Sequence, residues 1–411
     1  MDVEETFDAV RRREFDRSFI RQADLDVLVR ERRSALPWRG QFTPGLVSKL
    51  LDAYYPGSGM VVDPFLGSGT TVLECIRKGI PSAGVEINPA ALELSGILEI
   101  ASLPHDQRLR IVQEASSHLD KVDDAGQDTL FGSSAGIEDV VEYLLDGHRG
   151  AVDKNIERIF STTLLLSMGD KKEADAKKVK KSWNQVRDLI MDFPSASVPS
   201  QVIAGDARRV PLGDGCAGLV VTSPPYINVF NYHQNYRPAV ENIGWNVLPA
   251  ARTEIGSNRK NRQNRFLTVI QYCVDMMQAL CEMERLVFEG GNVVLVVGRE
   301  SRVRGVAFSN SEIVAALAEG LPNLRFARWQ ERKFTNRFGA VIYEDVLSFE
   351  VDKTSTVPAR AKLDEFSREV ARHVLTEALE QSTDDVRKDL QSAVESVTKV
   401  EASPELSLLK V

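Results

Sequence analysis

The 411 residues carry a formal net charge of −8, and 43% of them are hydrophobic and 27% charged. This length allows a large buried core and exceeds one typical domain, and the composition excludes a fully disordered or collagen-like chain. The negative charge argues against a protein that coats nucleic acid over its whole surface, but it is compatible with a local basic cleft. Apolar runs such as residues 293–297 are too short to span a bilayer, and the acidic start lacks the apolar region of a secretory signal. We therefore expect a cytoplasmic protein that does not enter a membrane.

The four cysteines are Cys75, Cys216, Cys273 and Cys281. They form no C-x-x-C pair, and no histidine lies beside them at metal-ligand spacing. We expect free, buried thiols in a reducing compartment and neither a structural zinc nor another metal site.

Residues 1–35 alternate charged residues with isolated apolar ones, which predicts a helical arm. Its two basic stretches, residues 11–13 and 30–33, favour a solvated helical face, with contact to nucleic-acid phosphates as the alternative. After a loop, Thr43 and Pro44 are typical of an N-cap and a first helical residue.

Residues 59–63 predict a strand, residues 64–69 a tight loop, and Thr70 the start of a helix that leads to a second strand at 82–87. Doubly wound folds bind nucleotides at such a loop, where Gly67 and Gly69 let the backbone approach a ligand. No lysine follows Gly69, so this is not the phosphate-binding G-x-x-x-x-G-K-[ST] pattern. Taken alone, the loop is more typical of an ordinary strand-to-helix turn.

Two acids follow predicted strands. Glu86, at the end of the second strand, has the position of a carboxylate that accepts hydrogen bonds from both ribose hydroxyls of an adenosine group. Asp206, directly after the strand at 201–204, lies where an adenine amino group could donate to it. The alternatives are a solvent-exposed carboxylate for Glu86 and a turn or helix-cap residue for Asp206.

The region between these acids, residues 90–198, reads mostly as helix and includes a lysine-rich stretch at 170–181. We expect an inserted helical subdomain. Residues 251–265 are polar and basic with almost no core-forming residues, which predicts an exposed loop. A long helix at 269–287, strands at 293–297 and up to 349, and a charged helical tail from 353 complete the chain.

Residues 222–226 (TSPPY) follow the apolar strand at 217–221. Two prolines end the strand and fix the backbone, and because they lack an N–H their carbonyls accept without a competing donor. Ser223 adds a hydroxyl acceptor, and Tyr226 adds a flat ring with a polar tip. A rigid proline turn is the alternative explanation.

This combination suits the methylation of an aromatic amine, whose lone pair is delocalised into its ring. The Ser223 hydroxyl and the Pro224 carbonyl would accept its two N–H bonds and favour a pyramidal nitrogen with its lone pair aimed at a methyl sulfonium. No strong base is needed before attack, because the proton becomes acidic once the methyl group is added. Tyr226 would stack on a base flipped out of a duplex.

These features, in this order, resemble the motifs of the amino-group DNA methyltransferases. Residues 63–70 (DPFLGSGT) resemble motif I, Glu86 matches the acid of motif II, Asp206 matches motif III, and residues 223–226 match motif IV. Residues 42–44 resemble motif X, which in the family packs beside the methionine end of the cofactor.

The resemblance extends to later strand motifs at 289–294 and 338–347 and covers residues 36–90 and 200–350, about half of the chain. In the common layouts of the family, motifs II and III lie close together, whereas here a long helical block separates them. The element that reads the DNA target is therefore not identified by the resemblance.

The resemblance implies an α/β, Rossmann-like class I methyltransferase fold with a mostly parallel sheet, helices on both faces, a helical insertion and a helical C-terminal extension. The expected parts are an N-terminal arm at 1–35, a first core part at 36–90, the insertion at 91–199, a second core part at 200–352 and the extension at 353–411.

The resemblance also implies S-adenosyl-L-methionine as cofactor and double-stranded DNA as substrate. The residues expected at the catalytic site are Ser223, Pro224, Pro225 and Tyr226. Those expected to bind the cofactor are Phe42, Thr43, Asp63, Pro64, Phe65, Gly67, Gly69, Thr70, Glu86 and Asp206.

Family members with Ser at the first position of motif IV mostly make N4-methylcytosine, and those with Asp mostly make N6-methyladenine. Ser223 therefore favours cytosine N4, within a restriction-modification or related defence system that has a possible cognate endonuclease. Adenine N6, an RNA or protein amide, and a non-catalytic cofactor-binding module are the alternatives.

The DNA contacts are expected first in the basic loop that follows the catalytic motif, through Arg252, Arg259, Lys260, Arg262 and Arg265. The lysine stretch and the N-terminal arginines are further candidates. The segment 228–236, with Phe230, Tyr232, His233 and Tyr236, is expected to line the pocket or wedge against the duplex, with core packing as the alternative.

Overall fold

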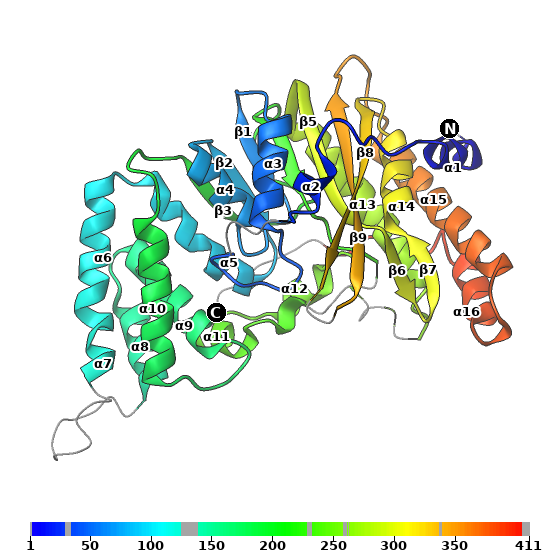
Figure 1. Cartoon of the computed structure of the whole chain (residues 1–411). Helices are drawn as coiled ribbons and strands as arrows, with labels where there is room; N and C mark the ends of the chain where they lie inside the picture. Colours follow the sequence, from blue (N-terminus) through cyan, green and yellow to red (C-terminus); the bar gives the residue numbers. More distant parts are fainter. Residues whose placement is uncertain are drawn as a thin grey trace.

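A computed structural model describes residues 2–28, 34–124, 139–227, 232–257, 261, 263–336 and 339–404. Its centre is a seven-stranded sheet with the strand order β3-β2-β1-β4-β5-β9-β8 (Figure 1). The strands are β1 (Met60–Asp63), β2 (Ser82–Glu86), β3 (Ser200–Ala204), β4 (Ala217–Thr222), β5 (Val287–Gly298), β8 (Leu324–Thr335) and β9 (Val341–Val351). The first five in this order pair in parallel, and β9 is antiparallel to both β5 and β8. The expected mostly parallel α/β sheet is therefore confirmed.

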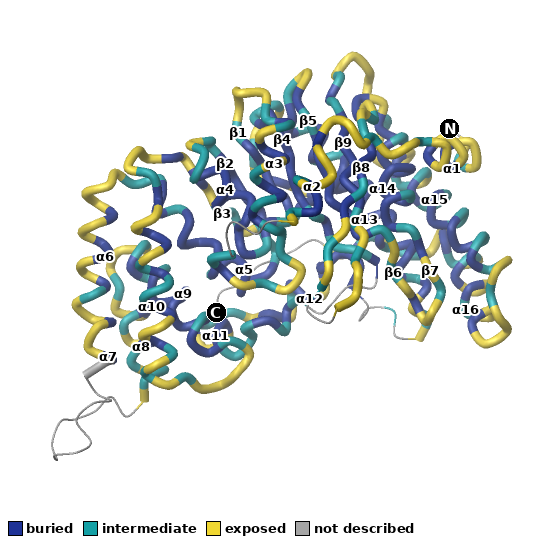
Figure 2. Tube along the Cα trace, in the orientation of Figure 1, coloured by how far each residue is buried: buried dark blue, intermediate teal, exposed yellow. Residues whose placement is uncertain are grey.

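The central strands are apolar on both faces because helices cover both faces of the sheet. In β5, Val293 and Leu295 belong to the hydrophobic cluster that includes α13 (Leu267–Leu286), α14 (Asn310–Glu319) and α15 (Arg360–Glu380). Val294 and Val296, the alternate residues of the strand, belong to the cluster on the other face, which includes α3 (Pro44–Tyr54). Figure 2 shows this buried centre between the exposed outer faces of the helices.

A helical block connects β2 to β3 and extends to one side of the sheet (Figure 1). It contains α5 (Pro89–Ser95), a 3-10 helix (Gly96–Ser102), α6 (His105–Leu119), α7 (Lys121–Asp124), α8 (Val140–Gly150), α9 (Lys154–Met168) and α10 (Ala176–Met191). Its apolar residues, such as Phe160 and Trp183, share one cluster with Val72 and Ile76 of α4 (Thr70–Lys78). The block therefore packs directly on the core. The expected lysine stretch lies partly on the solvent side of α10, where Lys177 and Lys181 are exposed.

The N-terminal arm differs from the continuous helix that its pattern predicts. Its described helices are α1 (Val3–Arg11) and the short α2 (Gln22–Leu25), because Asp16 caps an intervening turn through the backbone N–H groups of Ser18 and Phe19. Arg11 pairs with Glu312 and Glu377, and Arg13 pairs with Glu319. These two arginines hold α1 against α14 and α15 instead of forming a free basic face. The second basic stretch, residues 30–33, lies outside the described residues.

The predicted exposed loop at 251–265 is wrong for its first part. Residues 248–253 form α12 (Leu248–Thr253), and Thr253, Glu254, Ile255 and Ser257 are buried. The reason is that Glu254 accepts two hydrogen bonds from His233, one from its backbone and one from its ring, which ties this segment to residues 232–234.

The remaining described elements are a hairpin of β6 (Glu300–Val303) and β7 (Val306–Ser309), α11 (Arg237–Asn242) and α16 (Asp384–Glu395). In the part of the chain that the structure describes, no helix combines the length and apolarity needed for a membrane span. The four cysteines are free thiols, two of them buried.

Candidate active site

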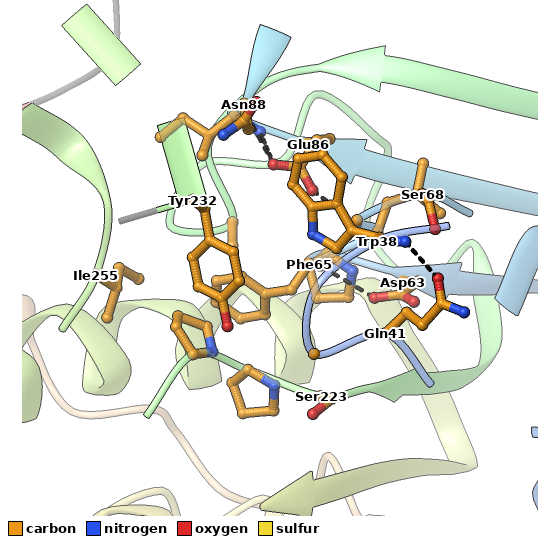
Figure 3. A pocket seen from close by; sticks show the side chains of 18 of the residues that line it. Trp38, Gln41, Asp63, Phe65, Ser68, Glu86, Asn88, Ser223, Tyr232 and Ile255 are labelled. Atoms are coloured by element: carbon orange, nitrogen blue, oxygen red, sulfur yellow. Dashed lines mark hydrogen bonds between the residues drawn. The ribbon is translucent and has the colours of Figure 1, made fainter. Parts of the chain in front are cut away.

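A pocket lies at the carboxyl ends of β1, β2, β3 and β4 and collects side chains from segments that are far apart in the sequence (Figure 3). The residues that line it are 38–42, 63–68, 70–71, 86–88, 205–207, 223–226, 253–255, Tyr232 and Glu344. All five motif segments predicted from the sequence thus contribute to one pocket. This edge is where doubly wound sheets bind their ligands, because the loops that follow parallel strands converge there.

Asp63 joins the first glycine loop to the strand before the catalytic motif. Its Oδ1 accepts hydrogen bonds from the Phe65 backbone N–H (3.0 Å) and the Thr222 hydroxyl (2.5 Å), and its Oδ2 accepts one from Thr71 (2.6 Å). Burial raises the pKa of Asp63 to about 6, while these three donors act in the opposite direction. These three donors fix the Asp63 carboxylate between the glycine loop, α4 and β4.

Glu86 is the last residue of β2, and it holds the glycine loop after β1 through a hydrogen bond from Gly67. Its carboxylate accepts hydrogen bonds from the backbone N–H groups of Gly67 (2.7 Å), Ile87 (2.9 Å) and Asn88 (2.8 Å). Burial raises the pKa of Glu86 to about 7 despite these donors. Gly67, with φ of 56°, lies under the Trp38 ring, which an added Cβ would meet at 3.4 Å.

Asp206 is held in a buried ionic network. Both of its oxygens accept from Arg208, and Arg208 also donates to Asp275 (2.8 Å) and to the carbonyls of Ser403 and Pro404. Arg208 is 7% exposed and Asp275 is fully buried. The carboxylate of motif III therefore has a fixed orientation that depends on the C-terminal segment.

Aromatic and aliphatic side chains form the apolar walls of the pocket. Trp38, Phe65, Tyr232 and Ile255 surround its centre in Figure 3. The Trp38 ring is nearly parallel to that of Tyr232, with centroids 6.5 Å apart, and to that of Tyr236, at 6.2 Å. These faces suit an adenine ring.

The charge of the pocket also fits S-adenosylmethionine. The described lining contains five carboxylates, Asp63, Glu86, Asp206, Glu254 and Glu344, and a single basic side chain, Arg39. S-adenosylmethionine carries a net positive charge, and its ribose hydroxyls match the acceptor at Glu86. The carboxylates that line the pocket therefore fit S-adenosylmethionine as a ligand. Among the described residues, no group of three or more His, Cys, Asp or Glu side chains could hold a metal ion.

Ser223 lies beside the cofactor motifs with its hydroxyl oriented by the sheet. Its Oγ donates to the Val296 carbonyl (2.9 Å) and lies 3.4 Å from the Tyr226 hydroxyl. The Tyr226 hydroxyl donates to Glu344 (3.3 Å), and its ring packs on Gly298, where a Cβ would meet the ring at 2.6 Å. Because Val296 takes the serine hydrogen, the Ser223 oxygen presents lone pairs to a substrate.

The structure distributes the other sequence-predicted residues as follows. Phe42, Pro64, Phe65, Thr70, Pro224 and Pro225 line the pocket. Thr43 lies in an adjoining hollow, and Gly69 faces Leu98, where its φ of 89° and an added Cβ at 2.5 Å both require glycine. The cofactor-binding and catalytic roles of these residues stay predictions.

The candidate DNA contacts are only partly within the described residues. Arg252 on α12 and Arg265 before α13 are exposed. Arg259, Lys260, Arg262 and Phe230 lie outside the described residues. Tyr232 lines the pocket as expected of its segment, whereas His233 is buried against Glu254, which agrees with the core-packing alternative.

Sequence reasoning missed several pocket residues. Trp38 and Gln41 precede motif X, and Glu344 lies on β9 more than one hundred residues after motif IV. Two adjacent acids, Glu344 and Asp345, in the first half of a strand were the signal for Glu344. Trp38 had no local signal beyond being a tryptophan in a loop.

Comparison with known proteins agrees with these motifs. Residues 25–96 match a family model described as DNA methylase, for N6 and N4 methyltransferases. The type II methyltransferase M.MjaII of Methanocaldococcus jannaschii is 42% identical over 53 residues, which are 13% of this chain and 10% of that protein. M.ScaI of Streptomyces caespitosus is 38% identical over 63 residues, 15% of this chain and 20% of that protein. The chain thus matches a tenth to a fifth of the length of these two relatives.

Solved structures with similarity to this chain include an S-adenosylmethionine-dependent methyltransferase of Methanosarcina mazei, with a TM-score of 0.33 and 11% identity over 74% of this chain and 97% of that chain. Another is the rRNA methyltransferase aviRa of Streptomyces viridochromogenes, with a TM-score of 0.33 and 12% identity over 80% of this chain and 93% of that chain.

The strand order, the antiparallel β9 and the position of the pocket define a Rossmann-like class I methyltransferase fold. Residues 25–96 are thus similar to a model for N6 and N4 DNA methylases, and the two type II methyltransferases share similarity over 53 and 63 residues. The match of residues 25–96 to this model agrees with S-adenosylmethionine as the cofactor.

Proposed function

We propose that this protein transfers the methyl group of S-adenosylmethionine to the exocyclic N4 of cytosine in duplex DNA. The observation that carries the proposal is the position of Ser223 in the pocket that also contains Asp63, Glu86 and Asp206. A base amine at Ser223 would therefore lie beside the bound cofactor.

The residues of this chain would act by orientation and electrostatics. The Ser223 oxygen and the Pro224 carbonyl accept the two N–H bonds of the amine, which directs the nitrogen lone pair away from the ring plane. The bound cofactor supplies an electrophilic methyl group on a sulfonium. Tyr226, held between Gly298 and Glu344, provides a flat face for the base.

The target base would leave the duplex to reach this buried motif, because a stacked base cannot enter a pocket of this kind. Exposed Arg252 and Arg265, together with Arg259, Lys260 and Arg262, are the proposed DNA contacts near the motif. We further propose a role in a cytoplasmic restriction-modification or defence system, on the basis of the two type II relatives.

Adenine N6 is the second candidate for the same site. The family model covers both N4 and N6 methyltransferases, so it does not separate the two amines. The serine at position 223 favours cytosine.

The decisive experiment expresses the chain in a host that lacks DNA methylation and analyses nucleosides from its DNA by mass spectrometry. N4-methylcytosine is expected, and it should be absent with Ser223→Ala, which retains S-adenosylmethionine binding. N6-methyladenine instead would establish the second candidate. Methylation of RNA alone, or no methylation by a folded protein that binds the cofactor, would contradict both.

A further inference from the structure

A second hollow adjoins the cofactor pocket on the side of β8 and β9. Its lining includes Gln41, Phe42, Ser223, Arg332, Phe334 and Glu344. Ser223 and Glu344 belong to both spaces. A substrate base that enters this second hollow and reaches Ser223 would therefore lie next to the cofactor pocket.

Arg332 is the unusual residue of this hollow. Its side chain is 3% exposed, and its Nη1 lies 3.2 Å from Glu344 Oε2. Its guanidinium carbon lies 5.0 Å from the Phe334 ring centroid. Its buried Nε has no hydrogen-bond partner among the described residues. An unsatisfied buried donor costs about 1–3 kcal/mol, so a donor retained in this state indicates a partner that binds later.

In the sheet, a single side chain, that of Glu344, connects Arg332 to Tyr226. Glu344 pairs with Gly298 on one side and with Arg332 on the other, in the register of β5, β9 and β8. The contacts run from Ser223 to Tyr226 (3.4 Å), from Tyr226 to Glu344 (3.3 Å) and from Glu344 to Arg332 (3.2 Å). Glu344 therefore fixes both the Tyr226 hydroxyl and the guanidinium.

We propose that Arg332, held by Glu344, binds the Watson–Crick edge of the target base and selects cytosine. This inference rests on the proposed function. Cytosine presents two adjacent acceptors, N3 and O2, next to its amine, and a guanidinium presents parallel donors that match such a pair. With the amine at Ser223 and Pro224, the hollow that Ser223 and Arg332 both line would receive the remaining edge of the base.

Adenine fits this arrangement less well. Its Watson–Crick edge offers one acceptor, N1, beside the amine, followed by a C–H group. One guanidinium donor would then face carbon and stay unsatisfied in a buried site. Arg332 thus supplies a physical reason for a cytosine preference that is independent of the identity of residue 223.

The test compares Arg332→Met with the wild type on duplex DNA that contains the mapped target site. One template carries cytosine and the other carries 3-deazacytosine, which lacks the N3 acceptor. For the wild type, kcat/KM should be about 10- to 100-fold lower on 3-deazacytosine than on cytosine. For Arg332→Met, kcat/KM on cytosine should be lower than that of the wild type by a similar factor. The variant should then show little further loss when cytosine is replaced by 3-deazacytosine. S-adenosylmethionine affinity should stay within about twofold.

The matched control is Arg325→Met. Arg325 lies on the same strand and pairs across to Glu350 as Arg332 pairs to Glu344, but it is exposed and remote from both pockets. It should retain wild-type kinetics on both templates. If Arg332→Met proves unstable in thermal unfolding, Arg332→Lys replaces it, because lysine keeps the charge beside Glu344 but loses the paired donors.

The possible results separate this inference from the proposed function. Wild-type protein that methylates no DNA contradicts the proposed function. Wild-type protein that methylates cytosine while the arginine variants show no coupling to N3 contradicts the role of Arg332 and leaves the function intact. Methylation of adenine N6 overturns the cytosine selection by Arg332.

Discussion

The hydroxyl of Thr222 donates a 2.5 Å hydrogen bond to the Asp63 carboxylate, and both residues are buried. This bond joins β4, which leads into the proline motif, to β1, which leads into the glycine loop. The segment after β4, residues 223–226, and the loop after β1, residues 64–69, are therefore tied to each other by a buried hydrogen bond between the strands that precede them.

The first prediction concerns this bond. Thr222→Val keeps the shape of the side chain but removes one of the three donors to Asp63, which should lower the free energy of unfolding by about 1–3 kcal/mol. Methyl transfer should fall more than cofactor affinity, because the motif at 223–226 loses its anchor. Denaturant unfolding and steady-state kinetics measure the two effects. Thr222→Ser keeps the donor and should restore both, and equal behaviour of the two variants would contradict the role of the hydroxyl.

The second prediction concerns pH. Burial raises the pKa of Glu86 to about 7, and in the proposed function its ionised form would accept hydrogen bonds from the ribose hydroxyls. At pH 6 about one tenth of the carboxyl groups would be ionised, so ligand affinity should be about tenfold weaker than at pH 8. Calorimetry with 5′-methylthioadenosine measures this, because that ligand has the adenosine group without a titrating amino acid.

Protein stability should respond to Glu86 in the opposite direction. Since its folded pKa lies above the ordinary glutamate value of 4.5, the folded state binds this proton more tightly than the unfolded state. Its contribution to the free energy of unfolding therefore rises as pH falls from about 7 to 4.5, so weaker ligand binding at pH 6 is not explained by unfolding. Glu86→Gln should bind weakly at both pH values, and a persistent pH slope in that variant would contradict the assignment.

The third prediction concerns the contact between the Tyr226 ring and Gly298. In Gly298→Ala the new Cβ would lie 2.6 Å from the ring, so the ring must leave its present position beside Ser223. Methyl transfer should fall about 100-fold, with cofactor affinity changed less than about threefold. Gly213→Ala is the control, because nothing lies within 4 Å of its added Cβ. Wild-type transfer rates in both variants would show that the position of the ring does not matter.

The fourth prediction concerns the C-terminal segment. Removal of residues 401–411 takes the Ser403 and Pro404 carbonyls from Arg208 and the Ser403 donors from Asp275. Breaking this buried ionic network should cost about 2–5 kcal/mol of stability and weaken cofactor binding through Asp206. Removal of residues 405–411 keeps all these contacts and serves as the control. Thermal unfolding with and without S-adenosylhomocysteine distinguishes the two truncations.

The sequence predicted those parts of the fold in which local pattern and tertiary burial agree. Strands β1 to β4, the start of α3 at Pro44 and the long helix α13 follow directly from apolar runs and caps. The β6–β7 hairpin was missed because its residues, such as Glu300 and Arg302, are polar and form a small sheet outside the core.

For the site, the motifs were recognisable because each follows a strand with an unusual residue combination. Their meeting in one pocket depends on the parallel order of the strands, which the motif order suggests. The Arg11 partner Glu312 lies 301 residues away, and the Arg208 partners Asp275 and Ser403 lie 67 and 195 residues away, so no local pattern reveals them. The same is true of Glu344 and Arg332, which only the register of β8 and β9 brings to Ser223.

The helical block between β2 and β3 also bears on how such an enzyme can diversify. Two parallel neighbouring strands need only a crossover of about a dozen residues, whereas residues 87–199 serve as the connection here. Its outer helices can accumulate changes without shifting the register of any strand in the sheet. Changes in these outer helices would alter the surface of the molecule and leave in place the strand ends that position the pocket.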